Sequence, residues 1–376
     1  MMIALARKTL SKDLLKRHGP FKVRAENSDP FEPDNARNDR SAEPFIRAEV
    51  TADLLDEVLA ERSSKATPLL KGATDSELAK YPAIQRALRI EARLRLQPGN
   101  RSGFVECRDV EPKGVILALH GWSAGTWQFE HLAGQFAKRG YHVYAPRLPG
   151  HGCTNHDGVP TTQEFPTNNQ VHLYTEFADR VYNEAASLNL PIHVIGLSGG
   201  GTIALDIAGR HSVSTAVLYD PFLSPGKPHA DNLMTIFRWL DRFTMGQSSL
   251  LLKLLPVVFA TPKKNVERWG RNGHVEFNAA HLYTLTHYGR EAIERAKNLK
   301  ISIQLVTSDF EPVTVSRKRL VELANSGEPR ALFAFDPALK VPHAMIHWRE
   351  FDNDQARAQA RALTFNLIKT EIPIGN

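Results

Sequence analysis

The sequence predicts an α/β fold, a mostly parallel central sheet with helices on both faces. From about Gly103 onward, short apolar runs with strand character alternate with longer amphipathic stretches with helical character. Such alternation is typical of a parallel sheet covered by helices. The residues with unusual chemistry directly follow the apolar runs, at the strand ends where ligands bind in sheets of this type.

The composition is that of a globular protein. Hydrophobic residues make up 42% of the chain, and no stretch approaches the ~18 apolar residues that cross a bilayer. The net charge of +6 is scattered along the sequence, which favours a solvated surface over nucleic-acid binding. Cys107 and Cys153 lack the spacing of a metal site, and they indicate free thiols in a reducing compartment, with a single disulfide left open.

The N-terminal segment is basic and mixes charged with apolar residues. Residues 19–44 are interrupted by prolines and have few apolar side chains to bury, so we expect residues 1–45 to form a flexible tail. Met1–Leu15 lacks the continuous apolar segment of a secretory signal. We therefore expect a cytoplasmic protein, with organelle targeting or peripheral membrane binding through this basic segment as the alternative.

Residues 46–102 are predicted to form a helical extension packed against the main domain. Thr51 can cap a helix over Ala52–Glu61, whose leucines and valine fall on one face. A second helical piece is predicted over about Asp75–Ile90.

The main domain is predicted to consist of residues 103–221 and 299–376. Between them, residues 222–298 have helical character and no strand-like run. An insertion of this size at the active-site end of a sheet predicts a helical cap. Strands are expected over 114–119, 141–145, 192–196, 215–219, 301–307 and 331–335, and helices over 126–139, 171–188, 200–208, 233–240, 250–259 and 279–296.

The strongest chemical signal is Gly196-Leu197-Ser198-Gly199-Gly200, which fits the pattern G-x-S-x-G. An apolar strand precedes it and a helix of small residues follows it, which is the context of a nucleophilic serine on a sharp turn. The start of that helix stabilises developing negative charge. Ser198 is therefore the predicted nucleophile.

A second signal, His120-Gly121-Trp122-Ser123, directly follows the predicted strand over 114–119. Acyl transfer needs amide donors aimed at an oxyanion, and the N–H groups of Trp122 and Gly199 are predicted to supply them. Ser123 is a further candidate contact. His120 is predicted to have a structural role.

The general base is expected late in the chain, after the nucleophile and the acid. His343 follows the last predicted strand after a short loop, and His347 is its competitor. The acid is expected after the strand over 301–307, where Asp309 and Glu311 both occur. Either carboxylate can hold the tautomer of the histidine and stabilise its charged form.

On these residues the chain resembles the α/β-hydrolase superfamily, and within it the carboxylesterase, monoacylglycerol-lipase and serine-aminopeptidase-like group. The resemblance rests on the segments at His120, Leu148-Pro149-Gly150-His151-Gly152, Ser198 and Pro342-His343, and it covers about Gly103 to the C-terminus. It implies the α/β-hydrolase fold, with a cap in the expected place.

The family pattern G-x-x-D-x-V, laid on Ser308 to Val313, puts Glu311 at the acid and favours it over Asp309. Asp220 is the third choice. The resemblance gives His151 and Cys153 no catalytic role.

The sequence thus predicts a serine hydrolase that cleaves a carboxylic ester through Ser198, His343 and Glu311, with an acyl-enzyme intermediate and no metal or organic cofactor. The expected substrate is a small acyl ester, which the apolar cap would suit if it is lipid-like. An amidase or peptidase, an acyltransferase, and a non-catalytic binding protein with the same fold are the alternatives.

Overall fold

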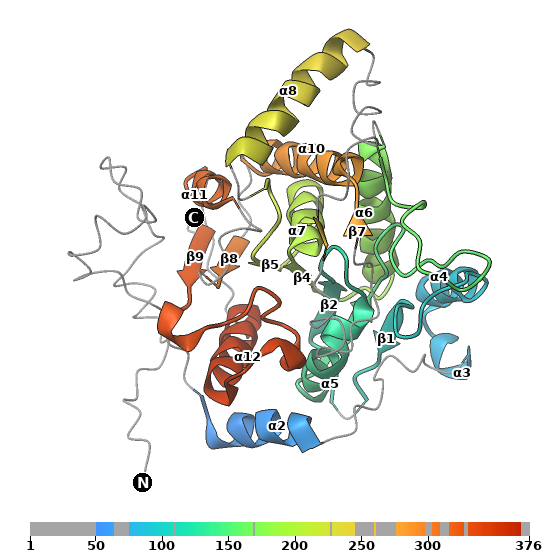
Figure 1. Ribbon diagram of the computed structural model, residues 1–376. Coiled ribbons are helices and arrows are strands. Elements are labelled where there is room, and N and C mark those ends of the chain that lie inside the picture. The colour runs from blue at the N-terminus through green and yellow to red at the C-terminus, as the bar shows by residue number, and fades with distance from the viewer. Residues whose placement is uncertain are drawn as a thin grey trace.

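The computed structural model describes residues 50–63, 75–108, 110–167, 170–225, 228–244, 259–260, 276–297, 303–308, 316–326 and 330–369. A seven-stranded sheet runs through the middle of the protein, with strand order β1-β3-β2-β4-β5-β8-β9 (Figure 1). All its neighbouring pairs are parallel except β1 with β3. The strands are β1 Gly103–Val105, β2 Gly114–Leu119, β3 Tyr141–Ala145, β4 Ile192–Leu197, β5 Thr215–Tyr219, β8 Ile303–Thr307 and β9 Arg330–Ala334. The predicted mostly parallel sheet is confirmed.

Helices cover both faces of the sheet because its strands are apolar on both sides. Along β2, Val115, Leu117 and Leu119 pack into one core with α6 (Val171–Ala186) and α7 (Gly199–Arg210). The alternate residues of β2 pack into the other core. That second core is closed by α2 (Ala52–Ser63), η1 (Thr126–Phe129), α5 (Glu130–Lys138) and α12 (Asp354–Lys369). Of these, α2, α5 and α12 lie together in the lower part of Figure 1. The short elements α11 (Arg317–Ala324), η3 (Pro337–Leu339) and η4 (Trp348–Glu350) connect and flank the last strands.

The extension before β1 is helical, as predicted. Thr51 caps α2, because its Oγ1 accepts a hydrogen bond from the N–H of Leu54 at 3.2 Å. The second predicted piece is two helices, α3 (Asp75–Leu78) and α4 (Pro82–Ala92). Pro82 begins α4 because proline fits the first helical turn and ends a preceding helix.

The insertion after β5 holds α8 (Pro228–Thr244), a two-stranded antiparallel pair of β6 (Phe259–Ala260) with β7 (Glu276–Phe277), and α10 (Ala279–Ala296). The sequence predicted only helices here, and most of the helix expected over 250–259 lies outside the described residues. α8 projects from the body of the protein in Figure 1, whereas α10 packs on α7.

The contacts of α10 fix it to the sheet's helical layer. Tyr288 stacks on Tyr174 of α6 at 5.1 Å between ring centroids, and its hydroxyl donates to Asp206 of α7.

Cys107 and Cys153 are both free thiols. None of the described helices is both long and apolar enough to cross a membrane.

Candidate active site

Ser198 occupies the sharp turn between β4 and α7. Its φ of 53° lies in the left-handed region, which a non-glycine residue seldom adopts. The turn is held because the N–H of Ser198 donates to the carbonyl of Tyr219 at 2.8 Å. A Cβ at Gly196 or Gly200 would lie 2.3 or 2.2 Å from backbone oxygen atoms, so both positions require glycine. The strained turn predicted from the sequence is therefore present.

Asp220 lies beside this turn because the sheet register puts it there. Leu197 of β4 is paired with Tyr219 of β5, so Ser198 and Asp220 both come directly after a paired strand end. Asp220 is buried and also has a positive φ, of 39°. Ser308, directly after β8, donates its hydroxyl to Asp220 Oδ2 at 2.8 Å.

Of the two candidate histidines, His343 is the one beside this carboxylate. His343 Nδ1 lies 3.4 Å from Oδ2 of Asp220. His347 instead packs edge-on against Trp127, with 4.7 Å between ring centroids. Asp220 was the third choice for the acid in the sequence. The sequence signal for Asp220 was its position directly after an apolar strand, because Ser198 has the same position on the neighbouring strand.

The predicted acid Glu311 and its competitor Asp309 lie outside the described residues. The family pattern placed Ser308 on a glycine. In the structure, the hydroxyl and the N–H of Ser308 both donate hydrogen bonds to the carboxylate of Asp220.

The loop after β2 presents one amide toward the nucleophile turn. The N–H of Gly121 donates to Gln128 Oε1 at 2.7 Å, and the N–H of Ser123 donates to His151 Nε2 at 3.2 Å. Within the described part of the chain, no acceptor takes the N–H of Trp122 between them. A Cβ at Gly199 would lie 3.4 Å from the Trp122 nitrogen, so the two backbones are adjacent. Ser123 was a further candidate contact for the oxyanion, but its N–H already donates to His151.

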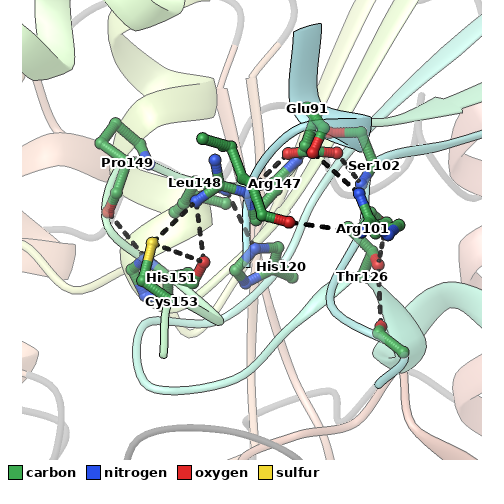
Figure 2. A network of polar contacts seen from close by, with 12 residues as sticks. Glu91, Arg101, Ser102, His120, Thr126, Arg147, Leu148, Pro149, His151 and Cys153 are labelled. Atoms are coloured by element: carbon green, nitrogen blue, oxygen red, sulfur yellow. Dashed lines mark hydrogen bonds and ion pairs between the residues drawn. The ribbon is translucent and has the colours of Figure 1, made fainter. Parts of the chain in front are cut away.

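His120 has the structural role predicted for it. It is fully buried, its Nε2 accepts from the N–H of Leu148 at 3.1 Å, and its Nδ1 faces the carbonyl of Gly121 at 2.9 Å. The imidazole is neutral near pH 7, because burial lowers the pKa of His120 to about 3. Figure 2 shows this ring between the two loops that it joins.

Aromatic side chains cover the loop after β2. The Trp122 indole lies against Phe277 of β7, with 3.9 Å between ring centroids, and Phe277 lies 5.2 Å from Phe165. The insertion after β5 thereby contributes an apolar group next to the residues that flank Ser198. Phe277 and Phe165 are both buried, so these rings pack the insertion onto the loop that carries Trp122.

Residues 110–333 match the family model described as "Serine aminopeptidase, S33". This match spans more than half of the chain. The chain belongs to that family. The strained turn of Ser198 lies within the matched residues, whereas His343 follows them.

Curated proteins match this chain over local stretches, and two of them are 35% identical to it there. A thermostable monoacylglycerol lipase of Bacillus sp. (strain H-257) is 35% identical over 100 residues, which is 27% of this chain and 36% of that protein. The magnesium-chelatase 30 kDa subunit of Rhodobacter capsulatus is 35% identical over 95 residues, or 25% of this chain and 30% of that protein. The chain thus spans about a third of the length of these relatives.

A solved structure has the same fold. The soluble variant of monoglyceride lipase from Saccharomyces cerevisiae, in complex with a substrate analogue, aligns with a TM-score of 0.51. The alignment covers 71% of this chain and 91% of the yeast chain at 13% identity. At this identity the likeness concerns the fold alone.

Proposed function

We propose that the protein is a serine hydrolase that cleaves carboxylic esters, with Ser198 as nucleophile and His343 as general base. The observation that carries the proposal is the meeting of three features at one edge of the sheet. Ser198 stands on a strained turn, His343 faces a buried carboxylate that follows the neighbouring strand, and the N–H of Trp122 is left without a described acceptor. This combination matches the needs of acyl transfer.

In the proposed mechanism, His343 takes the proton of the Ser198 hydroxyl as it attacks the acyl carbonyl. The carboxylate of Asp220 holds the imidazole in orientation and stabilises its charged form. The N–H groups of Trp122 and Gly199 hold the oxyanion. His343 then protonates the leaving alcohol, and water repeats the sequence to release the acid.

For the acid we propose Asp220 over Glu311. The 3.4 Å approach to His343 and the hydrogen bond from Ser308 support Asp220, whereas Glu311 rests on the family pattern in the sequence. An aspartate directly after β5 is as close to the nucleophile's strand as the sheet allows, because β4 and β5 are neighbours.

The ester preference is supported by the local likeness to a monoacylglycerol lipase. The rival is an amidase or peptidase on the same groups, which the family's description as a serine aminopeptidase favours. An acyltransferase would need an acceptor site in addition. A catalytically silent binding protein with this fold is the alternative of another class.

The test compares wild type with Ser198→Ala in two assays, labelling with a fluorophosphonate and hydrolysis of p-nitrophenyl esters of increasing chain length. Ser212→Ala, an exposed serine just beyond the far end of α7, is the matched control. We expect wild type and Ser212→Ala to label and turn over, and Ser198→Ala to do neither. Amino-acid p-nitroanilides assayed alongside separate ester from amide preference. Wild type that neither labels nor hydrolyses any substrate would overturn the proposal.

A further inference from the structure

An ion pair ties the N-terminal extension to a loop behind the active site. Glu91, near the end of α4, accepts from Nε of Arg147 at 2.5 Å, and only 10% and 12% of the two side chains are exposed. The second carboxylate oxygen of Glu91 accepts from the N–H of Ser102 at 2.5 Å. A carboxylate this buried is stable only when it is fully paired. Glu91 precedes the residues that the family model matches, whereas Arg147 lies within them.

Arg147 connects the ion pair with Glu91 to the loop after β3. Its Nη1 donates to the carbonyl of His151 at 2.8 Å, which closes the loop over residues 147–151. Its own N–H donates to Ser102 Oγ at 2.7 Å. The loop is therefore held at its start by Ser102 and across its span by the guanidinium.

Two histidines join this loop to the loop that carries Trp122. Nε2 of His120 accepts from the N–H of Leu148, and Nε2 of His151 accepts from the N–H of Ser123, at 3.1 and 3.2 Å. In both rings the accepting Nε2 leaves the proton on Nδ1, which faces a backbone carbonyl. The rings thus act as fixed spacers between the loops, and Figure 2 shows the unbroken series from Glu91 to His120 and His151.

The linker between α4 and β1, residues 93–102, packs between the loop after β2 and the loop after β3. A Cβ at Gly125 would lie 2.1 Å from Asn100 Oδ1, and one at Gly152 would lie 2.4 Å from Asn100 Cβ. Thr126 donates its hydroxyl to the carbonyl of Arg101 at 2.6 Å. Both loops therefore contact this linker, which connects them to each other.

We propose that Glu91 is a positioning residue for the oxyanion-binding amide of Trp122, acting through Arg147 and His151. The proposal rests on the proposed function, since it concerns the geometry of that site. The flanking amides of Gly121 and Ser123 are fixed by Gln128 and His151. A shift of the His151 loop would therefore rotate the Trp122 amide away from the developing oxyanion, which lowers the rate of the chemical step more than substrate affinity.

The test measures kcat and KM for a p-nitrophenyl ester in wild type, Glu91→Gln and Glu57→Gln. Glu57 is the matched control, because it makes an ion pair from the same extension to Arg139 of the core at 3.0 Å, away from these loops. Glu91→Gln keeps the shape of the side chain but loses its charge. We expect its kcat to fall about 10- to 100-fold, with KM within about twofold of wild type. Glu57→Gln should stay within about twofold in both parameters.

Arg147→Lys is the second variant, in case Glu91→Gln folds poorly, and the double variant completes a cycle. If Glu91 acts through Arg147, the double variant should lose no more kcat than the worse single variant. Glu91→Gln with the kcat of Glu57→Gln, or effects that multiply in the double variant, would overturn the inference. Because Ser198→Ala is run in the same assay, Ser198-dependent turnover by wild type separates that result from a failure of the proposed function. Wild type without turnover would overturn both.

Discussion

His343 and Asp220 face each other across the carboxyl edge of the sheet, with 3.4 Å between Nδ1 and Oδ2. Asp220 comes directly after β5, and His343 lies in the loop that follows β9 and η3. Because β5 is the neighbour of β4, the register brings this carboxylate next to the turn of Ser198. The position of Asp220, the proposed acid, is thus fixed by strand pairing, whereas the position of His343 depends on the course of a loop.

The first prediction concerns this acid. Asp220→Asn should lower kcat about 10³- to 10⁴-fold, because the amide no longer stabilises the charged imidazole or fixes its tautomer. Glu311→Gln should remain within about threefold of wild type. Both are measured by hydrolysis of the same p-nitrophenyl ester, with thermal unfolding as the check on folding. The reverse pattern would return the role of the acid to Glu311.

The second prediction compares two adjacent glycines of the nucleophile turn. A Cβ at Gly200 would lie 2.2 Å from the carbonyl oxygen of Leu119 and 2.4 Å from that of His120, whereas one at Gly201 would lie 3.0 Å from Pro221. Gly200→Ala should therefore lower the free energy of unfolding by about 3 kcal/mol or more, and Gly201→Ala by about 1 kcal/mol. Urea unfolding of both variants measures the difference. Equal losses would show that the turn yields to the added methyl group.

The third prediction is acid sensitivity caused by His120. Burial lowers the pKa of His120 from 6.5 to about 3. Between these two pH values the unfolded chain therefore binds a proton on His120 that the folded protein does not bind. The free energy of unfolding should then fall as pH drops from 6.5 toward 3, at about 1 kcal/mol per pH unit from this residue. His120→Gln should be less stable at pH 7 but should depend less on pH. Urea midpoints from pH 7 to 4 test this, and parallel curves for the two proteins would contradict it.

The fourth prediction concerns Asp206, which is fully buried in α7 and clamps α10 to it. Its carboxylate accepts from Arg210, from Arg295 at 2.6 Å and from the Tyr288 hydroxyl at 2.8 Å. Asp206→Ala should lower the free energy of unfolding by about 3–5 kcal/mol, because two arginines lose their shared partner. Tyr288→Phe removes one neutral donor and should cost about 1 kcal/mol.

Thermal unfolding measures both Asp206→Ala and Tyr288→Phe. Tyr288→Phe should keep kcat within about twofold of wild type, since the ring stays in place against Tyr174. A loss of kcat without a loss of stability would instead connect α10 to the catalytic step.

The strained turn of Ser198, the proposed nucleophile, could be predicted because its signal is local. Gly196, Ser198 and Gly200 are close in sequence, and each glycine is required by a backbone contact within the turn or with β2. His343 is predicted as the general base from its order along the chain, which the sheet topology dictates. The candidate acid is harder to choose from the sequence, because carboxylates follow two different strands and only their positions relative to His343 distinguish them. The insertion after β5 was predicted as helical, and its β6–β7 pair was missed because two-residue strands leave no periodic pattern.

By itself, the sequence determined the α/β class, the strained turn of Ser198 and the structural role of His120, because alternating apolar runs and short glycine-bounded segments act over a few neighbouring residues. Only the tertiary structure decided that Asp220 faces His343 and that Glu91 reaches Arg147. Those contacts join residues far apart in the chain, and they depend on which strands are neighbours and on how the loops pack. A single sequence carries no direct record of either.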